Sequence, residues 1–338
     1  MVLNPTARRV ISVFVLIVLM GTIYLLGAQK NFGLQQYGQL TLDGIRGGTI
    51  YALIALGFVV IYNVTGIINF AQGAFVMLGA MITADLFGRE LLAFSPAVNL
   101  VVAILAAILI TTLVGVLVER LVIYPARDAS PLTLIIITVG VYIVLQGIAL
   151  MIWGTGALRL PAFSTFFTDA ARDPTFRPFG IVVKAQSFWI WGTTIVTLAA
   201  LAWFFDRTLL GKAFRACAVN REAARLMGIR TNRMSMLAFA IAAALGAIGG
   251  IVLAPVTSPL YDMGLQLGLK GFVAAIVGGL VSAPAAVIGG ILLGVVENVV
   301  AGVTKSGLKD IFAFIILILI LIYRPQGILT ETRETEKV

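Results

Sequence analysis

Residues 206–233 read DRTLLGKAFRACAVNREAARLMGIRTNR, a polar segment in a chain that is otherwise largely apolar. The segment has two acids, Asp206 and Glu222, and seven basic residues: Arg207, Lys212, Arg215, Arg221, Arg225, Arg230 and Arg233. Positively charged loops next to membrane spans stay on the cytoplasmic side. We therefore expect 206–233 to be a cytoplasmic loop that joins two spans.

The centre of this loop has the signals of a short helix. Asn220 can cap the N-terminus through its side-chain oxygen, and Glu222 places a negative charge in the first turn. Gly228 can adopt the left-handed conformation that ends a helix. The apolar residues between these signals predict a small docking surface: Ala223, Ala224, Leu226 and Met227. The alternative is a solvated loop whose charges only set topology, but the ordered helix signals favour docking.

Composition places the chain among membrane proteins. Its 338 residues are 60% hydrophobic and only 12% charged, and the mean hydropathy is +1.05. The net charge of +9 does not indicate nucleic-acid binding, because the basic residues lie in loops beside apolar stretches. With one cysteine, Cys217, and no histidine, an intrachain disulfide, a Cys/His metal site and a Ser-His-Asp triad are all excluded.

The apolar stretches predict an all-α, polytopic membrane protein of about ten transmembrane helices, with eight as the lower bound. The expected spans are 10–28, 45–64, 67–87, 97–118, 132–152, 187–205, 234–253, 270–280, 285–303 and 311–323. The first is too long for the apolar core of a secretory signal, so we expect it to be retained. Both termini are then cytoplasmic.

We expect one transmembrane permease domain over residues 1–338. Its predicted parts are a first span (10–28), a broken hairpin (45–87), middle spans (97–205) with an exterior loop (153–186), the cytoplasmic loop (206–234), the last spans (235–323) and a cytoplasmic tail (324–338). Segments 45–87 and 268–303 are both glycine-rich hairpins. The region 254–303 is compatible with two spans or with a re-entrant hairpin.

Asn69 and Gln72 are polar residues within the first broken hairpin. Three residues apart on a helix, they would share a face, and two amides facing lipid are unfavourable. They are therefore expected to face protein or a cavity. Two interpretations remain open: a hydrogen-bonded clamp between helices, or the lining of a substrate path.

The sequence contains no pattern for catalysis. Its few ionisable residues near spans form no paired carboxylates and no nucleophile–base pair, and the expected mid-span regions are nearly free of charge. A phosphate-binding loop is also missing, because Ala213 follows Gly211-Lys212 where Ser or Thr is required. The chain is therefore not an ATPase or another enzyme. It is either a passive channel for small neutral solutes or the membrane part of a pump driven by separate ATPase subunits.

Several motifs resemble the LivH-type permeases of the branched-chain (hydrophobic) amino-acid ABC importer family. Glu222-Ala223-Ala224-x-x-x-Gly228 is similar to the coupling loop of bacterial ABC importer permeases, and residues 211–216 resemble its branched-chain version. The segments 51–57, 68–73, 78–80 and 270–279 resemble the LivH type, as do Gly289-Gly290 and Glu297. The resemblance covers about residues 40–328. The family often has His where this chain has Gln72, whose amide does not titrate near neutral pH.

The resemblance implies a role for several residues. Contact with the ATPase is expected at Gly211, Arg215, Glu222, Ala223, Ala224 and Gly228. The translocation path is expected at Tyr51, Asn69, Gln72, Gly73, Glu297 and Asn298. No catalytic residue, metal or cofactor is expected in this chain, since ATP and Mg²⁺ would be bound by partner subunits.

The resemblance also implies a complex in the bacterial inner membrane. Its other members would be a second, LivM-type permease, two ABC ATPase subunits and a periplasmic substrate-binding protein. Membrane lipid is the remaining expected partner. The implied substrates are branched-chain or other hydrophobic amino acids, with urea, amides or aromatic acids as alternatives within the same importer type.

Overall fold

The fold is known from a computed structural model that describes residues 30, 32–89, 95–168, 173–280 and 282–304, with isolated residues at 307, 311, 314, 315 and 318. The predicted first span and tail lie outside the described residues. The same holds for most of the predicted last span, 311–323.

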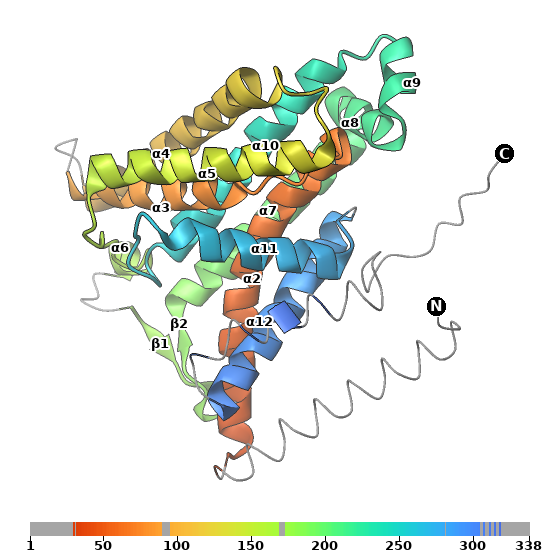
Figure 1. The fold of residues 1–338 in the computed structure, drawn as a ribbon. Helices are drawn as coiled ribbons and strands as arrows, with labels where there is room; N and C mark the ends of the chain where they lie inside the picture. The colour runs from red at the N-terminus through yellow and green to blue at the C-terminus, as the bar shows by residue number, and fades with distance from the viewer. Residues whose placement is uncertain are drawn as a thin grey trace, which may run out of the picture.

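The described part is almost entirely helical (Figure 1). Its α-helices are α2 (Leu34–Thr65), α3 (Gln72–Gly88), α4 (Pro96–Val118), α5 (Pro131–Trp153), α6 (Thr165–Thr168), α7 (Ala185–Arg207), α8 (Leu209–Val219), α9 (Arg221–Leu226), α10 (Thr231–Leu253), α11 (Met263–Gly278) and α12 (Ala283–Val303). A π-helical turn, Glu119–Ile123, extends α4, and a 3-10 turn covers Pro178–Gly180. Strands β1 (Thr175–Phe176) and β2 (Val183–Lys184) pair in antiparallel orientation.

Six of these helices are long and apolar enough to cross a membrane: α2, α4, α5, α7, α10 and α12. Two shorter apolar helices, α3 and α11, accompany them. Each of the eight predicted spans that fall within the described residues corresponds to one of these eight helices. The prediction of an all-α polytopic membrane protein is therefore confirmed.

The helix α2 is longer than the predicted span 45–64, because it begins at Leu34. Its polar first turns have protein partners at one end of the bundle. Gln39 donates from its amide nitrogen to the Val182 carbonyl oxygen at 3.1 Å and accepts from the Val182 N–H at 2.8 Å. The other end of α2 matches the prediction, since Gly66 has φ +70° and donates its N–H to the Tyr62 carbonyl oxygen.

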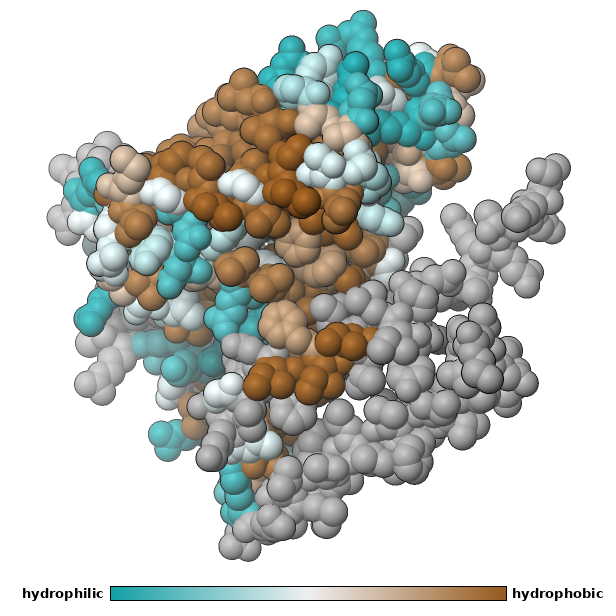
Figure 2. Space-filling model, viewed as in Figure 1, coloured by the Kyte–Doolittle hydropathy of each residue, from teal (hydrophilic) through white to brown (hydrophobic). Residues whose placement is uncertain are grey.

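An inner group of helices, α2, α3, α10, α11 and α12, holds most of the buried residues. α2 and α12 approach at backbone distance along a seam of small residues: a Cβ added to Gly294 would lie 2.3 Å from the Gly48 Cα. Small residues at such contacts let helices pack closely where no hydrophobic effect drives association. By contrast, α4, α5 and α7 expose broad apolar faces, seen as the hydrophobic surface around α5 in Figure 2.

The two ends of the bundle have different characters. The β1–β2 hairpin packs near the N-terminal end of α2, whereas α8 and α9 project from the opposite end (Figure 1). Hydrophilic residues gather over α8 and α9 in Figure 2. The molecule thus has a polar cap at one end, connected to the inner helices through α8 and α10.

Candidate coupling loop and interior polar sites

The loop 206–233 folds into two short helices rather than the single one that the sequence predicts. The additional helix, α8, is capped by Thr208, whose hydroxyl accepts from the Gly211 N–H at 2.9 Å. Gly211 lies against the end of α7: a Cβ there would sit 2.1 Å from the Phe204 carbonyl oxygen. A glycine is therefore required at position 211, because α8 packs closely on α7.

An aromatic cluster and an ion pair fix α8 to the end of α7. Phe214 is buried, and its ring centroid lies 5.6 Å from that of Phe204 and 5.9 Å from that of Phe205. Arg215 pairs with Asp206 at 2.9 Å and also donates to the Phe205 carbonyl oxygen. Gly211 and Arg215, both expected to contact the ATPase, thus have clear structural roles within this chain.

The second helix, α9, is capped at both ends as the sequence predicts. The Asn220 side-chain oxygen accepts from the Glu222 and Ala223 N–H groups, each at 3.0 Å. At the other end, the Gly228 N–H donates to the Arg225 carbonyl oxygen, and the Ile229 N–H donates to that of Ala224. Gly228 has φ +83°, which completes a Schellman motif.

The exposed face of α9 contains the residues of the predicted apolar surface except Ala224. Ala224 is buried, because it packs toward the rest of the chain, whereas Leu226 and Met227 are 88% and 84% exposed. Glu222 and Ala223 are exposed beside them. A further tie holds α9 in place: Arg221 donates to the Ser235 hydroxyl of α10 at 2.9 Å. The result is an anchored helix that presents two large apolar side chains.

Asn69 and Gln72 do not share a helix face, because Asn69 lies in the turn before α3 and Gln72 is the first residue of α3. Both are fully buried. The Asn69 side-chain oxygen accepts from the Ala71 N–H at 3.1 Å. The Gln72 amide nitrogen donates to the Ala242 carbonyl oxygen of α10 at 3.0 Å. The Gln72 bond joins α3 to α10 and favours the interhelical clamp for that residue. The Asn69 bond is local and does not distinguish the clamp from a path lining.

Gly73 is a packing position of the same kind. A Cβ on Gly73 would lie 2.1 Å from the Gly264 carbonyl oxygen, so α3 and α11 meet at backbone distance there. The glycine is required for this contact.

A buried ion pair joins the inner helices. Lys270, in the middle of α11, pairs with Glu297 of α12, and their side chains are 5% and 0% exposed. The Lys270 amine lies 3.4 Å from the Tyr51 hydroxyl of α2 and 5.5 Å from the centre of its ring. The sequence did not predict this pair, which places two charges inside the bundle although the mid-span regions were expected to be nearly free of charge.

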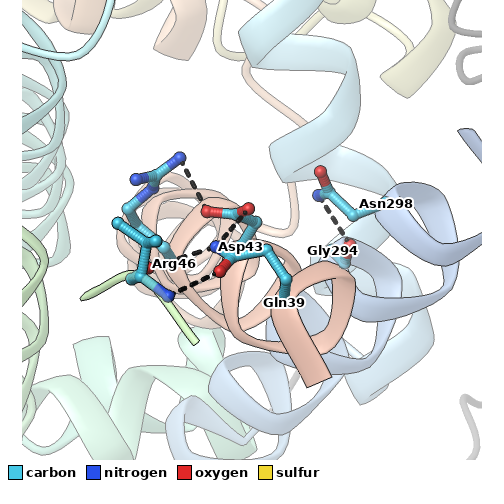
Figure 3. A network of polar contacts seen from close by, with 6 residues as sticks. Gln39, Asp43, Arg46, Gly294 and Asn298 are labelled. Atoms are coloured by element: carbon cyan, nitrogen blue, oxygen red, sulfur yellow. Dashed lines mark hydrogen bonds and ion pairs between the residues drawn. The ribbon is translucent and has the colours of Figure 1, made fainter. Parts of the chain in front are cut away.

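A second polar group lies nearer the N-terminal end of α2 (Figure 3). Arg46 pairs with Asp43 at 3.1 Å, and both side chains are partly exposed. Gln39 donates to the other Asp43 oxygen at 2.9 Å. Across from them on α12, Asn298 donates to the Gly294 carbonyl oxygen at 3.0 Å and faces Gly47.

Known proteins with related sequences identify the chain's family. The model of the family described as "Branched-chain amino acid transport system / permease component" matches residues 40–321. The chain is 34% identical to the high-affinity branched-chain amino acid transport system permease protein BraD of Pseudomonas aeruginosa, with 89% of this chain and 98% of BraD aligned. It is 33% identical to the LivH permease proteins of Salmonella typhimurium and Escherichia coli K12, over 89% of this chain and 97% of each relative.

The chain belongs to this permease family. The permease is therefore a multi-pass membrane subunit of a bacterial branched-chain amino acid ABC transport system, and not an enzyme. This membership sets aside the passive channel and confirms the resemblance drawn from the sequence motifs. No solved structure matches the permease.

The interior ion pair of the permease is the feature that sequence reasoning missed. One signal was present: Lys270 and Glu297 are the lone charges of two otherwise apolar helices, α11 and α12. An isolated charge within a membrane segment normally pairs with another. This rule would have predicted that Lys270 and Glu297 pair with each other. The contact with Tyr51 is visible only in the three-dimensional arrangement.

Proposed function

We propose that this permease forms the translocation path of an ATP-driven importer for branched-chain or other hydrophobic amino acids. Its partners would be a second, LivM-type permease, two ABC ATPase subunits and a periplasmic binding protein. The whole chain acts as one permease domain in the inner membrane, with about ten spans and cytoplasmic termini. Support comes from the family and from the eight apolar helices of the described residues.

Coupling to the ATPase is assigned to α8 and α9. The observation that carries this assignment is the exposed tip of α9, where Leu226 and Met227 project although the helix is capped and anchored. Large apolar side chains held in water on a rigid helix are typical of a docking surface. ATP-driven closure of the ATPase dimer would move α9, and the anchored α8–α7 and α9–α10 contacts would transmit this movement to the spans.

Gly228 provides a sharp test of coupling. A Cβ at Gly228 would meet no atom within 4 Å, so a substitution there acts only through the left-handed backbone. We expect Gly228→Val to abolish stimulation of the ATPase by the loaded binding protein, because a β-branched residue disfavours that conformation. Gly228→Asn is the matched control, since Asn tolerates left-handed φ and should retain most of the stimulation. Equal stimulation in both variants would remove Gly228 from coupling.

The docking surface is tested separately. Leu226→Asn removes an exposed apolar side chain, so we expect unchanged folding of the permease but weaker co-purification of the ATPase subunits. Phe179→Asn is the control, because Phe179 is 94% exposed at the opposite end of the bundle. Loss of ATPase subunits in both variants, or in neither, would contradict docking on α9.

The translocation path is proposed to run beside α2, where Tyr51, Glu297 and Asn298 lie. For Gln72 and Gly73, the contacts with α10 and α11 support interhelical packing. The Asn69 contact is local, so a variant is needed to decide between packing and path lining. Transport that is unchanged in an assembled Asn69→Leu, Gln72→Leu double variant would exclude a role of both amides in the path. The exact substrate follows from the ligand of the binding protein encoded with this permease.

A further inference from the structure

A line of residues with polar contacts, called the polar file below, follows one ridge of α2. Gln39, Asp43, Gly47 and Tyr51 are spaced four residues apart, so they lie along one ridge of the helix. Gln39 and Asp43 bond to each other, Asn298 of α12 faces Gly47, and Tyr51 contacts the Lys270–Glu297 pair. Figure 3 shows the outer part of this file, with Arg46 beside Asp43 and Asn298 on the neighbouring helix. The file connects a partly exposed end to a sealed one.

Each end of the file carries one positive and one negative charge. Asp43 and Arg46 form the outer pair, with 30% and 21% of their side chains exposed. Lys270 and Glu297 form the inner pair, which is buried. The levels of Asp43 and Tyr51 on α2 are separated by about 12 Å, from the rise of 1.5 Å per residue. The outer and inner ion pairs thus carry the same charges but differ in solvent exposure.

Stability does not explain the inner pair. Removing two charges from water is unfavourable, and a neutral pair of similar volume is often equally or more stable. The pair also joins α11, a short apolar helix, to α12, which is long and apolar enough to cross a membrane. Ionisable residues are rare in such segments and are usually functional. A role that requires both charges is therefore the better explanation.

We propose that Lys270 and Glu297 form a charge gate that a zwitterionic solute opens by exchanging partners with it. The solute's carboxylate pairs with Lys270 and its ammonium pairs with Glu297, so every charge stays paired throughout. Tyr51 keeps its contact with the lysine amine, which holds that side chain in place when the pair separates. Asp43 and Arg46 offer the same two charges to the solute before it reaches the gate.

This gate selects by charge pattern. An uncharged amide or urea replaces neither partner, so opening would leave two opposite charges separated in the bundle. A simple cation or anion would replace one partner and strand the other, which is strongly unfavourable in a membrane. The proposal rests on the importer function proposed above, and it narrows the substrates to amino-acid zwitterions over urea, amides and aromatic acids.

Two double variants separate charge from shape. Lys270→Met with Glu297→Gln keeps the approximate shape and removes both charges. Lys270→Arg with Glu297→Asp keeps both charges, and the larger cation offsets the shorter acid. A third variant, Asp85→Asn with Arg89→Gln, neutralises an ion pair of α3 that lies off the polar file and serves as the control.

The measurement is ATP-driven leucine uptake into liposomes that contain the assembled transporter and receive loaded binding protein. We expect the charge-free variant to lose at least about tenfold of the uptake, while the charge-keeping variant and the control retain most of it. Assembly and the ATPase stimulated by loaded binding protein are measured on the same samples. They should persist in every variant, because the gate is distant from α9.

Three results would overturn the charge gate. Uptake at the wild-type level in the charge-free variant would show that the pair only packs the helices. Better uptake in the charge-free variant than in the charge-keeping one would show that transport follows shape. Loss in both double variants with assembly intact would show that charge is not sufficient. A wild-type transporter without stimulated ATPase would instead overturn the proposed importer function, which separates the two failures.

Discussion

The helices α2 and α5 are both long and apolar, yet they occupy opposite environments. In the most apolar stretch of α2, 83% of the residues are buried, whereas 22% are buried in that of α5. The more apolar of the two, α5, is the exposed one. This order is the reverse of that in a water-soluble protein, where the most apolar helix lies in the core.

The physical reason is the solvent. Lipid tails are as apolar as leucine side chains, so burying an apolar helix against protein brings little hydrophobic gain. Close contact and polar pairing decide which helix is inside. α2 has the glycine positions Gly44 and Gly48 against α12, together with Tyr51 beside the ion pair, whereas Gly140 and Gly147 of α5 approach nothing within 4 Å. Predictions can therefore be made as matched pairs of substitutions on inner and outer helices.

The largest difference is expected for glycine substitutions. Gly48→Leu would place a side chain where a Cβ already lies 2.6 Å from the Gly290 carbonyl oxygen, so α2 and α12 could not pack. We expect a destabilisation above about 4 kcal/mol and no folded permease in detergent. Gly140→Leu on α5 is the control, and it should yield the wild-type amount of monodisperse protein by size-exclusion chromatography. Similar yields for the two variants would break the comparison between inner and outer helices.

Truncation of an isoleucine should give a smaller difference of the same sign. Ile54 on α2 is fully buried, and Ile136 on α5 is 63% exposed. In a bilayer, truncating an isoleucine loses packing contacts but little hydrophobic transfer free energy. We therefore expect Ile54→Ala to destabilise by about 2 kcal/mol and Ile136→Ala by much less. Thermal unfolding midpoints in one detergent test this order. A larger shift for Ile136→Ala would mean that the outer face is packed in the isolated chain.

Replacement of a glutamine tests polar pairing alone. Gln72→Leu removes the hydrogen bond from α3 to the Ala242 carbonyl oxygen of α10. We expect a loss of about 1 kcal/mol, because hydrogen bonds between membrane helices are modest. Gln146→Leu on α5, where the side chain is partly exposed, should be neutral or slightly stabilising in the same unfolding assay. Equal effects would indicate that Gln72 contributes little to the clamp.

The last test concerns the polar end of the molecule. Burial raises the pKa of the Cys217 thiol, and the nearby Arg221 only partly offsets this. The reactive thiolate therefore forms at higher pH than in an exposed cysteine, and access is limited as well. We expect Cys217 to react with a maleimide at least about tenfold more slowly at pH 7 than Ala223→Cys in a Cys217→Ala background. Equally fast labelling would show that α8 does not stay packed on the bundle.

The sequence predicted several local features correctly. Asn220 and Gly228 cap α9, because caps and left-handed glycines depend on only a few neighbouring residues. The helix α8 was not predicted, since its formation depends on Phe214 packing against the end of α7. Ala224 was assigned to the wrong face for the same reason: the contacts of a short helix with its neighbours decide which side is exposed.

The amino-acid sequence alone is enough to identify an apolar, multi-span helical permease with a basic loop and a capped short helix. Hydropathy, charge in loops and capping residues are local properties, and the family motifs are read from the chain directly. The three-dimensional packing was needed to show which spans lie inside, that Lys270 meets Glu297 beside Tyr51, and that Gln72 bonds to α10. Hydropathy does not distinguish inner from outer spans, because α7, the least apolar of the six described spans, and α5, one of the most apolar, are buried to the same extent. Inner and outer spans are distinguished by close contacts and by the pairing of isolated polar groups, and both exist only once the helices are assembled.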